Sequence, residues 1–201
     1  MVSNINSTYR RLEKDRIHQG DVLLDFQFPH IVYFNGETDV EIISNPYCFV
    51  ISQDCDLDGA HNLYEVINEC PDFNENNPIN GNKYLPSIII TPAFLADDVH
   101  GGTYLSELGF KMEDKGSKKR SKWKDITKNN NPRYHFIDSF NEYDFPQLVV
   151  DFKIFYTLPY DFIFHNYDFY HASLNELFRE NLSQRFFNYH SRIGLPTFKE
   201  E

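Results

Sequence analysis

Residues 47–57, YCFVISQDCDL, pass from an apolar run directly into a group of polar side chains. The apolar half is rich in aromatic and β-branched residues, a composition typical of a buried strand. The polar half holds a hydroxyl, an amide, a thiol and two carboxylates without a glycine: Ser52, Gln53, Asp54, Cys55 and Asp56. Loops at the ends of rigid strands usually carry binding and catalytic groups. We therefore place the candidate site at these five residues, the 52–56 tip.

Apolar alternation predicts further strands on both sides of this stretch. Residues 20–28, GDVLLDFQF, indicate a half-buried strand that ends at Pro29. One face is expected to hold Val22, Leu24, Phe26 and Phe28, and the other Asp21, Asp25 and Gln27. Asn35-Gly36 lies between two β-rich runs and predicts a tight hairpin. Residues 9–17 fit either a short charged helix or an extended segment. Further strands are expected at residues 63–68, 87–91, 133–137 and 148–158.

One long amphipathic helix is expected near the C-terminus, over residues 173–194. Ser173 and Glu176 have the spacing of a capping box, and Gly194 provides a stop signal. Between them, apolar residues recur at steps of three and four: Leu174, Phe178, Leu182, Phe186, Tyr189 and Ile193. Many short strands followed by one such helix predict an α+β protein, a small β-barrel capped by a C-terminal helix.

We interpret residues 1–201 as a single domain. Its β-barrel-like core spans residues 18–158, and residues 111–132, polar and rich in Lys and Asn, are expected to be a mobile basic insertion. No apolar run reaches membrane-spanning length and the first residues are polar, so we expect a soluble, cytoplasmic protein without membrane contact. Three irregularly spaced cysteines do not make a disulfide framework.

The formal net charge of −11 opposes non-specific adhesion to nucleic acid or anionic lipid. Six basic residues nevertheless gather in residues 115–124, KGSKKRSKWK, around a tryptophan. Cations for phosphates and a ring for stacking are typical of a nucleic-acid contact, and docking onto an acidic partner is equally open. The candidate binding residues of this run are Lys118, Lys119, Arg120, Lys122, Trp123 and Lys124. We expect its deletion to leave folding intact.

Two short motifs resemble the start of the SH3-like barrel of PemK/MazF-type toxins: GDVLL at residues 20–24 and VIS at residues 50–52. The likeness covers roughly the first 60 residues and implies the SH3-like barrel. Asn45-Pro46 stands where these endoribonucleases place a catalytic Arg-Pro, so the resemblance does not carry their nuclease activity to this chain.

The whole chain is similar to a bacterial protein family that has an S-Q-x-C-D motif and no established activity. The matching elements are SQDCDL at 52–57, RYH at 133–135, VDFK at 150–153, LSQRF at 182–186 and RIGLP at 192–196. This resemblance implies one domain of bacterial or phage origin.

The candidate catalytic residues are Cys55, Asp56 and His135. A nucleophilic cysteine needs a nearby base and a lowered pKa, whereas the carboxylates on both sides of Cys55 raise the pKa of a thiol. The favoured interpretation is a buried thiol, with Asp56 pairing an arginine. A zinc site built from Cys48, Cys55, His61 and Cys70 has no recognised spacing, so neither a metal nor another cofactor is expected.

Arg185 and Arg192 lie two helical turns apart, on the flank of the apolar stripe that meets the body of the protein. A partly buried arginine needs a carboxylate. We predict that Arg185 or Arg192 pairs with Asp56 and locks the helix across the end of the barrel. Alternatively, the two arginines bind a phosphate or carboxylate ligand beside the 52–56 tip.

Together, these features favour a non-catalytic accessory protein of a bacterial toxin-type or phage-defence system. It would act through protein or nucleic-acid contacts, with a protein partner encoded nearby. The alternative is an enzyme, either a diverged endoribonuclease or a Cys55-dependent hydrolase.

Overall fold

The structure is a computed structural model that describes residues 8–70, 72–116, 120–140 and 145–191. Its centre is one antiparallel sheet with the strand order β1-β8-β2-β3-β4-β6-β5, and β7 pairs with β4 beside this path. The two ends of the sheet, β1 and β5, do not pair with each other. The protein is therefore a mixed α and β protein, as expected, but strand pairing does not close the sheet into a barrel.

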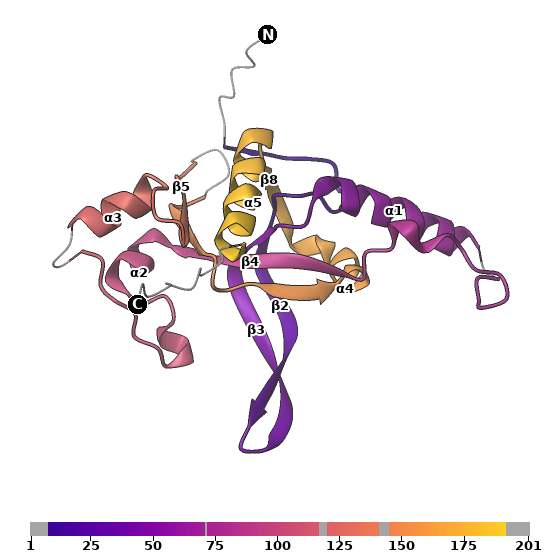
Figure 1. Ribbon diagram of the computed structural model, residues 1–201, viewed down its shortest axis with the longest axis horizontal. Helices are drawn as coiled ribbons and strands as arrows, with labels where there is room; N and C mark the ends of the chain where they lie inside the picture. The colour runs from indigo at the N-terminus through magenta and orange to yellow at the C-terminus, as the bar shows by residue number, and fades with distance from the viewer. Residues whose placement is uncertain (1–7, 71, 117–119, 141–144, 192–201) are drawn as a thin grey trace, which may run out of the picture.

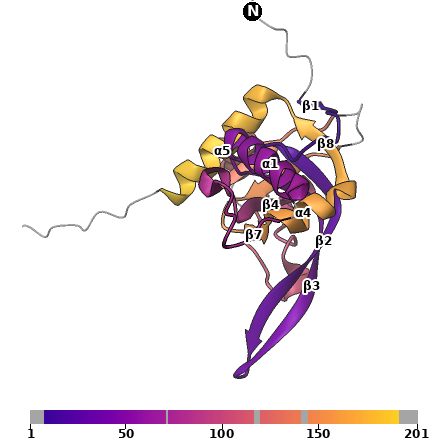
Figure 2. The same ribbon diagram turned by 90° about the vertical axis from the view of Figure 1, so that its right-hand side faces the viewer.

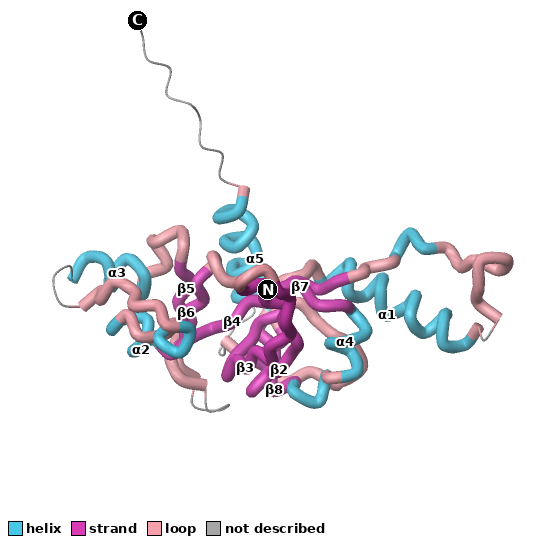
Figure 3. The backbone as a smooth tube through the Cα atoms, turned by 90° about the horizontal axis from the view of Figure 1, so that it is seen from below, coloured by secondary structure: helices cyan, strands magenta, loops and turns pink. Residues whose placement is uncertain are grey.

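The strands are β1 (Tyr9–Arg10), β2 (Asp21–Phe34), β3 (Glu37–Val50), β4 (Ser87–Leu95), β5 (Tyr134–Ile137), β6 (Leu148–Asp151), β7 (Tyr156–Pro159) and β8 (Tyr170–Leu174). The α-helices are α1 (Asp54–Glu69), α2 (Ala96–Gly101), α3 (Arg120–Thr127), α4 (Tyr160–His165) and α5 (Glu176–His190). Short 3₁₀ turns are η1 (Gly81–Lys83), η2 (Ser106–Leu108) and η4 (Tyr167–Phe169). Figure 3 shows α2 and α3 at one end of the sheet, beside β5 and β6, and α1 and α4 at the other.

The apolar run that opens the candidate site is the middle of the sheet, and both of its faces are covered. Cys48 and Val50 belong to a core cluster that also contains Leu57 of α1, whereas Phe49 and Ile51 belong to a second cluster with residues of α5. Alternate side chains of a strand point to opposite faces, so the run is apolar throughout because neither face meets water.

The Asn35-Gly36 hairpin is confirmed. Both residues have positive φ, 52° and 88°, as a tight two-residue turn between twisted strands requires. Pro29 does not end the first strand as expected, and β2 continues to Phe34. Among the described residues, β2 beyond Leu23 pairs only with β3, and an edge position tolerates the missing N–H of proline.

The expectation that Val22, Leu24, Phe26 and Phe28 share one face is wrong. Val22 contributes to the core cluster beside α5, whereas Phe26 and Phe28 contribute to the cluster beside α1. The change occurs at Asp25, which has φ 47° and forms no register pair with the opposite strand. One left-handed residue turns the strand over, so the buried face changes there.

Two further sequence predictions are corrected by helices. Residues 63–68 are the C-terminal part of α1 rather than a strand, because Leu57, Ala60, Tyr64 and Ile67 recur at helical spacing. The last helix begins at Glu176 with Asn175 as its N-cap residue, so the expected capping box is wrong. Ser173 instead lies in β8, and the expected continuation beyond residue 191 lies outside the described residues.

Residues 148–158 form two strands rather than one, because β6 and β7 pair with successive parts of β4. Residues 111–132, expected to be a mobile insertion, contain regular structure. They include α3, whose Ile126 is fully buried in a third core cluster with Tyr134 and Val149. Packing against β5 orders this part of the basic segment.

No helix in the described ranges is long and apolar enough to cross a membrane.

Candidate functional site

The 52–56 tip is the start of α1 rather than a loop. Gln53 is the N-cap residue, and Asp54 and Asp56 lie in the first turn, where carboxylates favour the positive end of the helix dipole. Ser52 is buried, and its hydroxyl accepts a hydrogen bond from the Ile89 backbone N–H at 2.9 Å. Ser52 therefore holds the tip to β4.

Asp54 is the centre of a partly buried ion cluster. Its carboxylate accepts hydrogen bonds from Arg16 Nη2 and from the Gln19 backbone N–H, both at 3.1 Å. His18 Nδ1 lies 3.5 Å away and Arg179 Nη1 of α5 lies 3.8 Å away. His18 and then Arg16 hold the pKa of Asp54 well below its usual range, and Asp54 raises the pKa of His18. The cluster joins the N-terminal segment, α1 and α5.

Arg185 does not pair with Asp56, so the part of the prediction that names Arg185 is wrong. Its guanidinium donates to three backbone carbonyls: Asn129 at 2.5 Å, and Asn131 and Tyr134 at 2.8 Å. These carbonyls belong to the α3–β5 connection and to the first residue of β5, so Arg185 joins α5 to that end of the sheet. Arg192 lies outside the described residues.

Cys55 is exposed at the surface, so the expected buried thiol is also wrong. Its sulfur contacts the Gln53 side-chain oxygen at 3.6 Å and Asp56 Oδ1 at 3.8 Å. Both partners are exposed, and neither is an imidazole. Within the described ranges, the contacts of this thiol include no histidine that would activate it.

His135 lies in β5, which β4 and β6 separate from the strand that leads to Cys55. Its side chain is buried beside Phe152, with ring centroids 6.3 Å apart. Burial, together with the nearby charge of Arg185, lowers the pKa of His135 to about 3. The structure therefore does not bring Cys55, Asp56 and His135 together as a catalytic set.

Part of the basic segment is held by the body of the protein. Lys122 Nζ pairs with Glu113 at 2.7 Å, and Lys115 is buried with its ammonium 5.7 Å from the Tyr134 ring centroid. Trp123 packs edge-on against His100 and Phe136, with centroids 4.8 and 6.4 Å apart. Lys124 is exposed, Lys118 and Lys119 lie outside the described residues, and the side chain of Arg120 is not described.

The most exposed apolar surface was missed by the sequence analysis. The outer part of the β2–β3 hairpin, residues 29–42, projects from the body of the protein (Figures 1 and 2); we call it the arm. Cross-strand pairs place Pro29 with Ile42, Ile31 with Val40 and Tyr33 with Thr38 on one face, the apolar face. Four large side chains on this face are widely exposed: Ile31 70%, Tyr33 74%, Val40 58% and Ile42 65%.

The opposite face of the arm is acidic. It pairs His30 with Glu41, Val32 with Asp39 and Phe34 with Glu37. The signal for both faces was present in the sequence, since IVYF and TDVEI flank the Asn-Gly turn. The register across the hairpin shows how these residues divide between the faces.

A groove of about 740 Å³ lies at the base of the arm, on the acidic-face side. Its lining comes from the arm, from residues 43–47 of β3, and from β4, the α2–η2 segment and the start of β7. Asn45 lines it and is only 8% exposed, and Asn45 Nδ2 has no hydrogen-bond partner within the described ranges.

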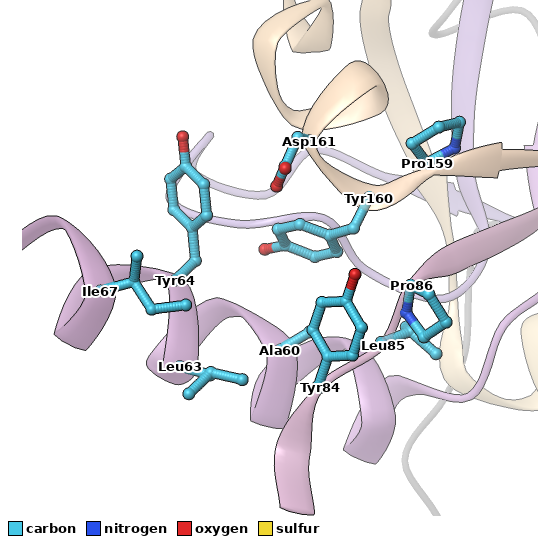
Figure 4. A pocket seen from close by; sticks show the side chains of 10 residues that line it. All are labelled: Ala60, Leu63, Tyr64, Ile67, Tyr84, Leu85, Pro86, Pro159, Tyr160 and Asp161. Atoms are coloured by element: carbon cyan, nitrogen blue, oxygen red, sulfur yellow. The ribbon is translucent and has the colours of Figure 1, made fainter. Parts of the chain in front are cut away.

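A smaller pocket of about 190 Å³ lies between α1 and α4 (Figure 4). The Tyr160 ring points into it between Tyr64 and Tyr84. Tyr64 donates to or accepts from His165 Nε2 at 3.1 Å, whereas the buried Tyr160 hydroxyl has no partner in the described part of the chain. Burial raises the pKa of Tyr160 to about 12, so this phenol remains a donor at neutral pH.

No known family model matches this chain, and no curated protein is significantly similar to it. The described residues also contain no group of three or more His, Cys, Asp or Glu side chains that could hold a metal ion.

Proposed function

We propose that this chain is a non-catalytic binding protein that docks a protein partner through the apolar face of the arm. The proposal places it as an accessory component of a bacterial toxin-type or phage-defence system. The single observation that carries it is the exposure of Ile31, Tyr33, Val40 and Ile42 on one face of a projecting hairpin. Docking through the arm does not require the SH3-like barrel that the toxin resemblance implies.

An exposed apolar face of this kind favours an interface. Monomeric proteins seldom expose contiguous apolar patches, and large patches mark interaction sites. Burying a side chain such as Ile31 or Val40 stabilises a complex by about 1.5–3 kcal/mol. A two-stranded ribbon is also marginally stable without a further packing surface, so a partner would stabilise the arm itself.

The charge of the arm favours a basic protein as the partner. Residues 29–42 contain three carboxylates, Glu37, Asp39 and Glu41, and no lysine or arginine. The chain as a whole has a net charge of −11. Electrostatic complementarity accelerates encounter with a partner of opposite charge, whereas phosphate backbones are repelled.

The enzymatic alternatives have less support. A Cys55-dependent hydrolase needs a base near the thiol, and the described contacts of Cys55 are an amide oxygen and a carboxylate. A nucleic-acid contact through residues 115–124 would require side chains that are partly engaged with Glu113 and the third core cluster.

The test uses photo-crosslinking in the native host, followed by reconstitution. A photoreactive amino acid at position 33 should crosslink one discrete protein, and the same group at position 69 on α1 should not. The purified partner should bind wild-type protein at least about 30-fold more tightly than the Ile31→Thr/Val40→Thr variant, as expected for loss of an interface hot spot.

The matched control is Val66→Thr, which changes an exposed apolar residue of α1 and should alter affinity less than twofold. Equal affinity of the arm variant and the control would contradict the proposal. If wild-type protein instead forms a stable dimer by sedimentation that the arm variant loses, the occupant is a second copy and the assignment of a different, basic partner is wrong.

A further inference from the structure

We propose that the groove at the base of the arm binds an extended peptide segment that carries arginine or lysine between apolar side chains. The inference rests on the proposed function, because it gives the partner protein a second contact on the face opposite the apolar one. Three independent features of the groove support it: an unpaired strand edge, a buried donor without a partner, and a cation-selective lining.

The groove lies where β3 and β4 separate. β3 pairs with β4 only from Tyr47 to Val50, opposite Ala93 to Ile90. Beyond Tyr47, β3 continues into the arm, while β4 continues along β6 to Leu95. Glu41 and residues 43–46 of β3 therefore line the groove, and no strand in the described part of the chain pairs with them on that side. An unpaired edge along a hollow is the template on which extended peptides add as a further strand.

Asn45 lines the groove and carries a buried hydrogen-bond donor. Its side chain is 8% exposed, and its Nδ2 is buried without a partner among the described residues. Native structures pair nearly all buried polar groups, because an unpaired donor loses its hydration without compensation. A main-chain carbonyl of a peptide lying in the groove would satisfy this donor.

The lining combines carboxylates with aromatic rings. Glu41, Asp98 and Glu107 contribute the carboxylates, and none of the lining residues is a lysine or arginine. The rings are Tyr47, Phe94, Tyr104 and Tyr156, and the last packs edge-on against His30 at 5.7 Å. Carboxylates pair with guanidinium and ammonium groups, and aromatic faces attract them further.

The size and charge favour a peptide over other ligands. A volume of about 740 Å³ accommodates several side chains, and the carboxylates repel phosphate groups. Only a polypeptide would use the free edge of β3 for main-chain hydrogen bonds. The smaller Tyr160 pocket lacks both the strand edge and this size.

The test measures binding of defined peptides by isothermal titration calorimetry. The probe is an acetylated and amidated hexapeptide of alternating arginine and valine. There are two matched control peptides. One has glutamate in place of each arginine, and the other is methylated at alternate backbone nitrogens. The arginine peptide should bind measurably, the glutamate peptide should not, and the methylated peptide should bind at least about tenfold more weakly because it cannot complete the strand pairing.

Variants assign the binding to the groove. Glu41→Gln/Glu107→Gln should weaken the arginine peptide about tenfold or more, and Asn45→Leu should weaken it while keeping a similar volume. Glu69→Gln/Glu75→Gln removes two exposed carboxylates elsewhere and should change affinity less than twofold. Melting curves identify any variant that has lost its fold. If Asn45→Leu unfolds, Glu41→Gln/Glu107→Gln still tests the groove, because both of its substitutions are at exposed positions.

Two results would overturn the inference: no binding of the arginine peptide up to about 1 mM, or equal loss of affinity in the groove and control variants. The Ile31→Thr/Val40→Thr variant, on the opposite face of the arm, should bind the peptide as the wild type does. If the partner binds but the arginine peptide does not, the inference about the groove is wrong and the proposed function stands. Peptide binding without any partner at the apolar face contradicts the proposed function alone.

Discussion

Arg133 holds the carboxylate of Asp151 by two hydrogen bonds, from Nε at 2.8 Å and from Nη2 at 2.5 Å. The Tyr104 hydroxyl donates a third hydrogen bond to Asp151 at 2.8 Å. Asp151 is fully buried, and its charge raises the pKa of Arg133. This buried pair, which the sequence did not predict, joins the start of β5 to β6 and the α2–η2 segment.

Asp151→Asn should strongly destabilise the protein. Removing one partner of a buried pair leaves the other charge without compensation and costs on the order of 3–5 kcal/mol. Urea unfolding should show a similar loss for Arg133→Met, and the double variant should lose less than the sum of the two. Glu176→Gln, which breaks the exposed pair with Arg10, should cost under about 1 kcal/mol. Equal small losses at both sites would contradict the role of the buried pair.

Asp21 should make stability fall as pH rises through mildly acidic values. Its buried carboxyl accepts hydrogen bonds from Ser173, Tyr167 and the His18 backbone N–H. Burial nevertheless raises its pKa to about 6, against about 3.9 in an unfolded chain. Between these values the folded state holds a proton that the unfolded state has released, so this contribution is complete below about pH 4 and lost by about pH 6.

Urea unfolding of wild-type protein and Asp21→Asn from pH 4 to 7 measures this contribution. The stability of the wild type relative to the variant should fall by about 2–3 kcal/mol across the window, at about 1.4 kcal/mol per pKa unit. Other titratable groups near Asp21 also affect the unfolding free energy: His18, Tyr167, Tyr170 and Asp15. Because they are present in both proteins, subtracting the variant's free energy from that of the wild type reduces their contribution. A flat difference would show that the folded carboxyl is already ionised at pH 4.

The three thiols should react in order of their exposure. Cys55 is exposed, Cys70 is partly exposed and Cys48 is fully buried, and burial raises the pKa of the Cys48 thiol. A thiol-specific chromogenic reagent should label Cys55 rapidly and Cys48 only after denaturation. Cys55→Ser should remove the fast phase and leave the melting temperature and partner binding unchanged. A slow Cys55 would contradict its exposure, whereas a ribonuclease or hydrolase activity that the Cys55→Ser variant loses would favour the enzymatic alternative.

Deleting residues 115–124 should destabilise the protein, in contrast to the expectation from its composition. The deletion removes the Trp123 contacts with His100 and Phe136 and five of the eight residues of α3. Ile126→Ala, which truncates the fully buried side chain of the same helix, should cost about 2–5 kcal/mol. Val66→Ala at an exposed site should cost no more than about 0.5 kcal/mol. An unchanged melting temperature after the deletion would show that the segment does not contribute to the core.

Local signals were sufficient for several elements. The Asn35-Gly36 turn was predictable because few residues adopt positive φ at two successive positions. The buried strand that ends at Val50 was predictable because its apolar run has no polar interruption. The last helix was predictable from its repeating apolar positions, although Asn175 rather than Ser173 caps it.

The candidate site was harder to predict because its polar residues are consistent with either a loop or a helix start. Asp54 and Asp56 favour the first turn of a helix as much as they favour a turn. The partners of Asp54 come from the N-terminal segment and from α5, far away in the sequence. No spacing rule relates such residues, so only the packed structure assigns Arg16 and Arg179 to Asp54 and removes Arg185 from the site.

By itself, the sequence determined the hairpin turn, the central buried strand, the mixed α and β class and the acidic charge, because these depend on neighbouring residues or on composition. Only the tertiary structure decided which surfaces remain open. IVYF at 31–34 has the composition of a core strand, yet Ile31 and Tyr33 are exposed because β3 separates from β4 at Tyr47 and none of the described helices covers the arm. Burial depends on what packs against a strand, and that is set by the path of the whole chain.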